Sequence, residues 1–274
     1  MGQQFLQNRK IGFIGGGAMA EALLRGLSNL FTPDRLAVSD LSEQRLKYLK
    51  EELSVNIYID NNLLCRDCTI LLLAIKPQVL PQVLTSLKGK IGRDHLVISV
   101  AAGISLQKLE SLLPEGVPAI RVMPNTPSLI GKGVSALSRG THVSDEQIEA
   151  AMTLMGAVGT VELVPEAYMD AVTGVSGSGP AYVYLFIEAF IDAAVREGLP
   201  RDLARNLALH TVIGAAEMVL QSGNHPAVEK DKVTSPGGTT IAALEALEEK
   251  GLRSALFAAV NAAAQRARQL ATSE

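Results

Sequence analysis

The stretch KIGFIGGGAMAEAL, from Lys10 to Leu23, decides the fold class of this chain. A short apolar run, typical of a buried strand, leads into consecutive glycines, and apolar residues at helical spacing follow. Gly15, Gly17 and Ala20 form the pattern G-x-G-x-x-A between the expected strand and the expected helix. In this context the pattern predicts a strand–turn–helix unit that binds the pyrophosphate of a dinucleotide.

Each small residue of this unit has a physical role in the prediction. Gly15 would form the tight turn, Gly17 would let the backbone approach a pyrophosphate, and Ala20 would let the helix pack close to the strand. The start of the helix offers unpaired N–H groups and the positive end of its dipole. A glycine-rich turn that binds no ligand is the alternative that the pattern leaves open.

The end of the second expected strand, RLAVSD, should contact the adenosine ribose of the dinucleotide. Asp40 is placed to accept a hydrogen bond from the ribose 2′-OH of NAD. Ser39, Ser42 and Arg45 could instead bind the 2′-phosphate of NADP. The two cofactors are therefore not distinguished by this segment.

Strand-like and helix-like segments alternate through the first part of the chain. The strand-like segments are KIGFIG, RLAVSD, VNIYI, TILLLAI, HLVISVAAG and PAIRVMPN, and GVSALSRG and VGTVELV could add edge strands. Such alternation predicts an α/β fold in which an N-terminal, Rossmann-type, doubly wound parallel sheet occupies residues 1–164.

The remainder, residues 165–274, is compatible with helix almost throughout, and glycine and proline separate its segments. Several of these helices are apolar on more than one face, which a helical module of this size cannot bury alone. We therefore expect an all-α dimerisation domain after the sheet.

Lys76 follows the apolar run TILLLAI at the sheet edge where ligands bind in open α/β folds. It could contact the cofactor, or it could be a strand-end lysine that reaches water. The segments SVAAGIS and RVMPNTP end two further strands with small residues and prolines, which would let a flat nicotinamide ring lie against the backbone.

Composition narrows the function classes. The 274 residues are 47% hydrophobic and 19% charged, with a net charge of −3, which favours a packed globule and gives no electrostatic footprint for nucleic acid. The N-terminus lacks the apolar core of a signal peptide, and TILLLAI is far shorter than the roughly 20 residues of a membrane helix. We expect a cytoplasmic protein with neither nucleic acid nor membrane as a partner.

Cys65 and Cys68 form a C-x-x-C pair, which is the spacing of a redox pair or half of a zinc site. The four histidines show no spacing that would complete a zinc site. We interpret the pair as two small residues that lead into a strand, and we expect no metal.

The segment VTSPGGTT, from Val233 to Thr240, precedes the expected helix IAALEALEEKG. Backbone N–H groups of a glycine-rich turn can form a nest for an anion, and the start of a helix adds more. The hydroxyls of Ser235 and Thr240 could each contribute a donor. Ordinary capping of a helix is the alternative.

Over nearly its full length the chain resembles the pyrroline-5-carboxylate reductase family. The resemblance rests on GFIGGGAMAEAL, LAIKPQ, SVAAGIS, RVMPNTP, DAVTGVSGSGPAY and KVTSPGGTTIAALEALE, in the order and spacing of the family. It implies an NAD(P)-binding domain, a helical dimerisation domain, and homodimers that assemble further into rings such as a decamer. It also implies that Val233–Thr240 holds the carboxylate of the substrate.

The resemblance assigns site residues by position. The positions that match the cofactor site are Ile14, Gly15, Gly16, Gly17, Ala18, Met19, Ser39, Asn61, Ala74, Ile75, Lys76, Pro77 and Ala102, to which we add Asp40. The substrate positions are Glu166, Ser235, Gly237, Gly238, Thr239 and Thr240, and the catalytic position is Thr173. The expected cofactor is NADP(H), with NAD(H) possible, because Asp40 stands where relatives that favour NADPH often carry a hydroxyl residue.

The implied reaction is hydride transfer from the reduced cofactor to the cyclic imine 1-pyrroline-5-carboxylate, which gives L-proline in the final step of proline biosynthesis. A cyclic imine protonates more readily than a ketone, so positioning would supply most of the rate enhancement. This agrees with a sequence that has no evident His or Lys catalytic constellation. The Thr173 hydroxyl would face the imine nitrogen.

Three other functions remain open. A β-hydroxyacid-type dehydrogenase would normally carry a catalytic lysine on the first long helix of the tail, but GPAYVYLFIEAFIDAAVREG has none. An imine reductase of broader range would not require the anion nest. A cofactor-sensing protein would have the same fold but would not turn over a substrate.

Overall fold

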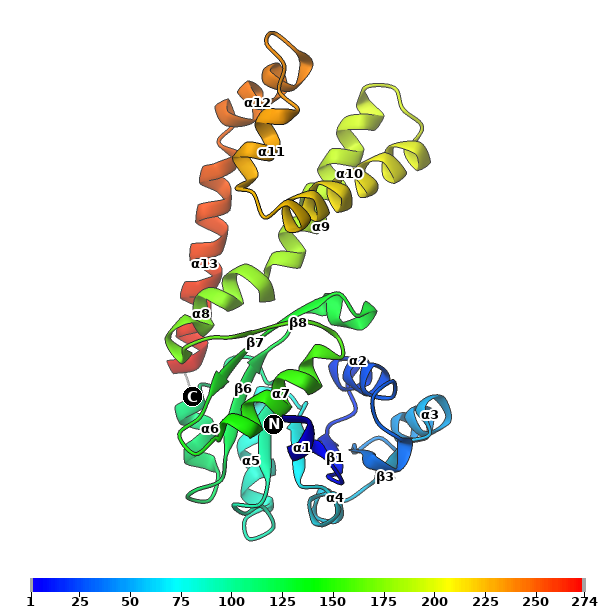
Figure 1. Cartoon of the computed structure of the whole chain (residues 1–274), viewed down its shortest axis with the longest axis vertical. Coiled ribbons are helices and arrows are strands. Elements are labelled where there is room, and N and C mark those ends of the chain that lie inside the picture. The colour runs from blue at the N-terminus through cyan, green and yellow to red at the C-terminus, as the bar shows by residue number, and fades with distance from the viewer. Residues whose placement is uncertain (1, 273–274) are drawn as a thin grey trace. The chain divides into compact units, whose positions relative to one another are not determined.

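The computed structural model describes residues 2–272, which form two compact units (Figure 1). The first unit comprises the residues up to Ser178 together with those from Ala263 onward, and the second is Gly179–Ala262. These units are defined by packing and do not decide where one functional domain ends. The division after residue 164 stays a prediction.

An eight-stranded sheet forms the centre of the first unit, with the strand order β3-β2-β1-β4-β5-β6-β7-β8. Neighbouring strands are parallel except for β6 and β7, which pair antiparallel. The strands are β1 Ile11–Ile14, β2 Leu36–Ser39, β3 Asn56–Tyr58, β4 Ile70–Leu73, β5 Leu96–Ser99, β6 Ala119–Met123, β7 Gly133–Arg139 and β8 Gly159–Leu163. The order reverses at β1, as in Rossmann-type sheets, so the prediction of this fold is confirmed.

Both faces of the sheet are covered, which explains why its central strands are apolar throughout. Phe13 and Leu72 lie in the core on one face, whereas Ile14, Leu71 and Leu73 lie in the core on the other. The α-helices of this unit are α1 Gly2–Leu6, α2 Ala18–Leu27, α3 Glu43–Leu53, α4 Asn61–Asp67, α5 Leu80–Ser86, α6 Leu106–Leu112, α7 Asp145–Gly156 and α8 Met169–Val172, and the end of α13 (Leu252–Thr272) also belongs to it.

Side-chain caps fix where several of these helices begin. Ser42 caps α3, Asp60 caps α4 and Ser105 caps α6, each accepting a hydrogen bond from a backbone N–H of the first turn. Ser144 and Gln147 form a reciprocal capping box at α7. Because α2, α4 and α6 all begin just after a strand, their N-termini lie at the carboxyl edge of the sheet.

The second unit is helical. It contains α9 Gly179–Arg196, α10 Arg201–Ser222, α11 Pro226–Lys232, α12 Thr239–Glu249 and the first part of α13 Leu252–Thr272. Gly198, Gly223 and Gly251 all have positive φ and follow helix ends, as expected for glycine at these positions. The prediction of an all-α region after the sheet is confirmed.

Large apolar side chains of this unit are exposed. No residue of α9 is buried, and the exposed apolar residues on α9, α10 and α13 include Tyr184, Leu185, Phe186, Phe190, Leu207, Ile213, Leu220 and Phe257. The continuous helix Glu166–Arg196 is even long and apolar enough, by length and composition, to cross a membrane. A helix buried between subunits has the same composition, and exposed apolar surface of this extent marks an interaction site.

Candidate active site

The glycine loop, from Ile14 to Met19, joins β1 to α2 and depends on Gly15 for its shape. Gly15 has φ +97° and donates its N–H to the carbonyl of Ser39 over 2.8 Å. A Cβ on Gly15 would lie 2.6 Å from the carbonyl oxygen of Ala74. The fold itself therefore requires glycine at this position.

Gly17 differs, because no atom of residues 2–272 outside its immediate chain neighbours occupies the space beside it. It is the N-cap residue of α2, with φ −66° and ψ −175°, and no side chain caps this helix. A Cβ on Gly17 would meet no atom within 4 Å. The open space lies against the uncapped N–H groups of the first turn, which begins with Ala18 and Met19, and it fits an anion such as a pyrophosphate.

Asp40 and Arg45 brace this loop from the next βα connection. Asp40 accepts the N–H of Gly16 over 2.8 Å and the N–H of Ser42 over 2.9 Å. The Nε of Arg45 donates to the carbonyl of Gly16 over 2.6 Å. Both side chains, read from the sequence as contacts to the ribose or its phosphate, thus also hold the protein backbone.

Arg45 is further constrained by an ion pair with Glu21 on α2, with its Nη2 2.5 Å from the Glu21 carboxylate. Partial burial raises the pKa of Glu21, but hydrogen bonds from Arg25, Arg45 and Tyr48 outweigh that effect and hold the pKa below its ordinary value. The carboxylate therefore stays charged and keeps Arg45 beside the glycine loop.

Ser39 and Asn61, both predicted cofactor positions, are brought together at the ends of β2 and the start of α4. The Ser39 side chain is buried, and its hydroxyl donates to Oδ1 of Asn61 over 2.6 Å. Ser39 therefore faces Asn61, whereas Ser42 is exposed and its hydroxyl accepts the N–H of Arg45.

The ends of β4 and β5 carry the other predicted cofactor positions. Ala74 donates its N–H to the carbonyl of Ile14 over 2.9 Å, which ties the segment from Ala74 to Pro77 to the glycine loop. Lys76 is exposed and makes no ion pair with any described residue. Ala102 is exposed in the loop after β5. All of them lie at the carboxyl edge of the sheet, where such folds bind ligands.

Glu166 is held by a partner that sequence reasoning missed. Arg121 on β6 is only 5% exposed, and its Nη1 lies 2.5 Å from Oε1 of Glu166. The same oxygen accepts the N–H of Leu106, the first residue of α6, over 2.9 Å. Oε2 of Glu166 is buried and has no hydrogen-bond partner among the described residues. An unpartnered buried carboxylate oxygen is costly unless a ligand uses it.

Thr173 begins a short π-helical segment, Thr173–Gly177, which we call the π-turn. Its hydroxyl donates to the carbonyl of Met169 over 2.8 Å, which leaves the lone pairs of that hydroxyl to accept a hydrogen bond. The N–H of Ser178 bonds to the carbonyl of Thr173 over 2.8 Å, five residues back. Such insertions in helices frequently occur at functional sites.

The glycine-rich turn Val233–Thr240 lies in the second unit and ends at the start of α12. Gly237 has φ +65°, and Gly238 donates its N–H to the carbonyl of Ser235 over 3.1 Å. A Cβ on Gly238 would overlap the hydroxyl oxygen of Ser235. No side chain caps α12 and no acidic residue lies in its first turn, so the N–H groups of Thr239 and Thr240 remain open to an anion.

The nearby cation does not supply this turn with charge. Lys232 pairs with Glu229 over 2.9 Å. Hydrogen bonds from Asn224 and Lys232 lower the pKa of Glu229 to about 2, so the pair stays ionised. An anion at the turn would be held by backbone dipoles and hydroxyls.

The cysteines take no part in the site. Both are free and buried, and burial raises the pKa of Cys65 and of Cys68 to about 12. Thiols of such high pKa are poor nucleophiles and poor metal ligands. Among the described residues no cluster of His, Cys, Asp and Glu could hold a metal ion.

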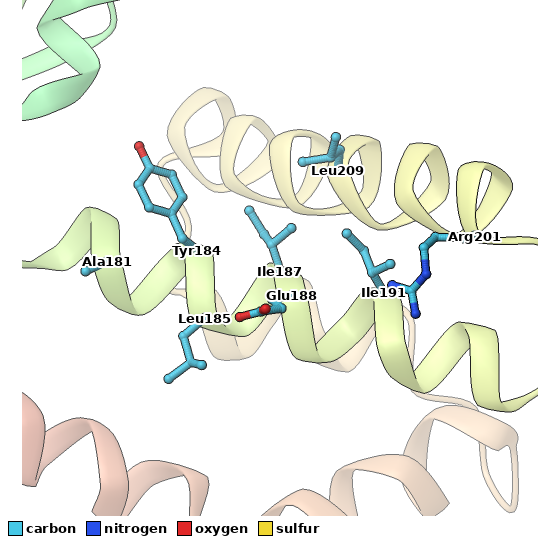
Figure 2. Close-up of a pocket in the computed structure, with 8 residues that line it drawn as sticks. All are labelled: Ala181, Tyr184, Leu185, Ile187, Glu188, Ile191, Arg201 and Leu209. Atoms are coloured by element: carbon cyan, nitrogen blue, oxygen red, sulfur yellow. The ribbon is translucent and has the colours of Figure 1, made fainter.

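A groove of the second unit is lined by none of these residues. It has a volume of about 670 Å³ and lies along α9 and α10 (Figure 2). The residues that line it are mostly apolar: Ala181, Tyr184, Leu185, Ile187, Glu188, Ile191, Arg201 and Leu209. None of them is a predicted site residue, and an open apolar groove of this kind suits a protein surface better than a polar substrate.

Comparison with known proteins identifies the family. Residues 166–270 match the family model "Pyrroline-5-carboxylate reductase dimerisation", and residues 10–103 match "NADP oxidoreductase coenzyme F420-dependent". The pyrroline-5-carboxylate reductase of Methanosarcina acetivorans is 45% identical over 267 residues, which cover 97% of this chain and 99% of that protein.

Solved structures agree. A pyrroline-5-carboxylate reductase from Coxiella burnetii superposes with a TM-score of 0.93 at 36% identity, covering 97% of this chain and 100% of the other. The Plasmodium falciparum pyrroline carboxylate reductase with NADP bound superposes with a TM-score of 0.87 at 34% identity, covering 97% and 99%. This chain belongs to the pyrroline-5-carboxylate reductase family.

Proposed function

We propose that this protein reduces 1-pyrroline-5-carboxylate to L-proline with NADP(H), the final step of proline biosynthesis. The observation that carries the proposal is the presence of two separate helix starts, at Gly17 and at Gly238, that have no side-chain cap. The backbone N–H groups of such starts suit anions. One suits the pyrophosphate of a dinucleotide, and the other suits a single carboxylate.

The cofactor site consists of the glycine loop and the strand ends beside it. The open space at Gly17 would admit the pyrophosphate, and the exposed Lys76 would offer a charge to a phosphate or to the nicotinamide ribose. Ser42, Asn61 and Asp40 would surround the adenosine ribose. NAD(H) is the alternative cofactor, because the Asp40 carboxylate would disfavour a 2′-phosphate.

When bound, the reduced nicotinamide supplies the hydride. The residues of this chain then have three tasks: to hold the substrate carboxylate, to orient the ring, and to accept a hydrogen bond from the protonated imine nitrogen. Ser235, Gly237, Gly238, Thr239 and Thr240 would do the first. The Thr173 hydroxyl would do the last, since its proton is already donated to Met169 and its lone pairs are available.

Glu166 would act beside the ring. Its Oε2 is buried without a partner, whereas Oε1 is held by Arg121 and by the N–H of Leu106. An ionised carboxylate at this place would favour the iminium form of the substrate, which is the form that accepts a hydride readily.

The protein would work as a homodimer in the cytoplasm. The exposed apolar faces of α9 and α10 and the match of residues 166–270 to a dimerisation model support the dimer. We further propose that dimers assemble into a ring such as a decamer, and that residues 1–164 form the cofactor domain while residues 165–274 form the dimerisation and substrate domain.

A spectrophotometric assay at 340 nm tests the function, with 1-pyrroline-5-carboxylate and either NADPH or NADH. Rapid oxidation of NADPH or NADH that depends on the carboxylate of the substrate supports the proposal. Equal turnover of the decarboxylated imine 1-pyrroline would point to a broader imine reductase. In a separate assay with NADP+ or NAD+, reduction of the cofactor by a β-hydroxyacid would point to a dehydrogenase. Binding of the cofactor without any turnover would refute catalysis.

A further inference from the structure

The π-turn contains a backbone carbonyl that its own helix leaves without the usual donor. In a regular α-helix the carbonyl of Ser176 would accept a hydrogen bond from the residue four positions on, but that residue is Pro180, which has no N–H. The irregularity is marked by the bond from Ser178 back to Thr173, five residues earlier. The Ser176 carbonyl therefore lacks its ordinary donor and is available to a donor from elsewhere.

Asn125 supplies this donor. Its Nδ2 donates to the carbonyl of Ser176 over 3.1 Å, and its Oδ1 accepts the N–H of Val134 over 2.9 Å. The orientation of the amide is fixed by chemistry, because the carbonyl requires a donor and the N–H requires an acceptor. Asn125 thus links the π-turn to β7 through a single side chain.

Asn125 lies at the edge of the sheet where the predicted cofactor positions are found. It stands two residues after β6, at the carboxyl end of that strand. The π-turn packs directly onto the same strand end, since a Cβ on Gly177 would lie 2.5 Å from Cε of Met123. Asn125 therefore fixes the π-turn at the edge of the sheet rather than stabilising a remote loop.

We propose that Asn125 is a positioning residue that holds the π-turn, and with it the Thr173 hydroxyl, in register with the carboxyl end of β6. The inference rests on the proposed reductase function, in which Thr173 contacts the imine nitrogen. A misplacement of about 1 Å can cost on the order of a hundredfold in rate, so one hydrogen bond at this point has a large effect on turnover.

Asn125→Asp isolates the bond to the π-turn. The retained oxygen still accepts from Val134, while the second oxygen faces the carbonyl of Ser176, so an attraction becomes a repulsion. We expect kcat to fall about 10- to 100-fold, with KM for the imine and Kd for NADPH changing less than about threefold. Asn125→Ala replaces Asn125→Asp if the latter yields no soluble protein.

Asn56→Asp is the matched control. The Asn56 Nδ2 donates to the carbonyls of Asp34 and Leu36 over 3.1 and 3.3 Å, at the amino ends of β2 and β3. The same substitution there sets an acceptor against carbonyls at the opposite edge of the sheet. We expect Asn56→Asp to lower Tm by about as much as Asn125→Asp does, and to leave kcat unchanged.

A double-mutant cycle with Thr173→Ala decides the inference. If Asn125 acts through Thr173, Asn125→Asp lowers kcat by less than about threefold once the hydroxyl is absent. Losses that multiply in the double variant, or a kcat for Asn125→Asp equal to that of the wild type, would overturn it. Failure of the wild type to oxidise either cofactor with 1-pyrroline-5-carboxylate would instead refute the proposed function, so the two failures are distinct.

Discussion

The substitution Gly17→Ala separates the ligand requirement of the glycine loop from its folding requirement. Alanine adopts φ −66° and ψ −175° without strain, and its methyl group would meet no protein atom within 4 Å. Alanine is a poorer N-cap than glycine by up to about 1 kcal/mol, but it also reduces the entropy of the unfolded chain by about 0.4–1 kcal/mol. The two effects nearly cancel.

Binding should suffer although folding does not. The methyl group would occupy the space that we assign to the pyrophosphate, and forcing an extra methyl into a packed contact costs about 1–3 kcal/mol. Converted at about 1.4 kcal/mol per tenfold, the Kd for NADPH should rise roughly 5- to 150-fold. Titration of the cofactor by fluorescence measures this, and differential scanning calorimetry should give a Tm within about 3 °C of the wild type.

Gly15→Ala, two residues earlier in the same loop, is the matched control. Alanine is strained at φ +97°, and its Cβ would lie 2.6 Å from the carbonyl oxygen of Ala74. A cost of about 1–3 kcal/mol for the backbone alone should lower Tm by several degrees. If Gly17→Ala bound NADPH as tightly as the wild type, the open space at Gly17 would not be the pyrophosphate site, whatever the effect of Gly15→Ala.

Three other substitutions or treatments test the remaining assignments. Asp40→Ser removes a negative charge beside the expected 2′-phosphate, so the ratio of kcat/KM for NADPH over NADH should rise at least tenfold, or about 1.4 kcal/mol. An unchanged ratio would leave Asp40 with only its hydrogen bond to the N–H of Gly16. Thr173→Ala should lower kcat/KM by one to two orders of magnitude while Thr173→Ser stays within about threefold, and equal activity of both variants would remove the hydroxyl from the mechanism. The pKa values of Cys65 and Cys68 are raised to about 12, so above pH about 9 the unfolded chain loses thiol protons that the folded chain retains. The free energy of unfolding should therefore fall as the pH rises from about 9 to 12. In urea titrations over that range, a Cys65→Ala/Cys68→Ala variant should show a smaller fall.

Local sequence patterns were sufficient to predict the strands and the glycine loop. Strand, turn and helix are specified within a few residues, and the apolar run Ile70–Leu73 is typical of a strand covered on both faces, which the structure confirms. The same holds for the glycines of the turn Val233–Thr240 and the helix that follows it, whereas the absence of a side-chain cap on that helix is seen only in the structure. These predictions rest on interactions between neighbours in the chain.

The contacts that the sequence did not reveal join residues far apart in the chain. Arg121 reaches Glu166 across 45 positions, and Asn125 reaches Ser176 across 51. Nothing local to Arg121 distinguishes it from an ordinary strand residue. Pro180 gives a local indication, because a proline four residues after Ser176 removes the usual donor to the Ser176 carbonyl. Only the fold shows that the side chain of Asn125 supplies a donor there.

The same limit explains the double use of Asp40 and Arg45. Their positions after β2 predict contact with the adenosine ribose, yet in the fold both also hold the backbone of Gly16. A carboxylate oxygen has two lone pairs, so Asp40 can brace the loop and still meet a ribose hydroxyl. A substitution at Asp40 will therefore change loop stability and cofactor choice together, which is why Tm must be measured beside the cofactor ratio.

Both anion sites that we propose for this protein would use backbone dipoles where side-chain charges would serve as well. Gly17 and Gly238 each cap a helix without a side chain, and the two lysines that precede the second turn, Lys230 and Lys232, are paired with Asp231 and Glu229. Peptide N–H groups do not titrate, so the carboxylate and pyrophosphate contacts keep their strength from mildly acidic to alkaline pH. The pH dependence of kcat/KM should then follow the protonation of the imine and of the carboxyl groups near it, which places the chemistry in the substrate and leaves to the protein the task of positioning it.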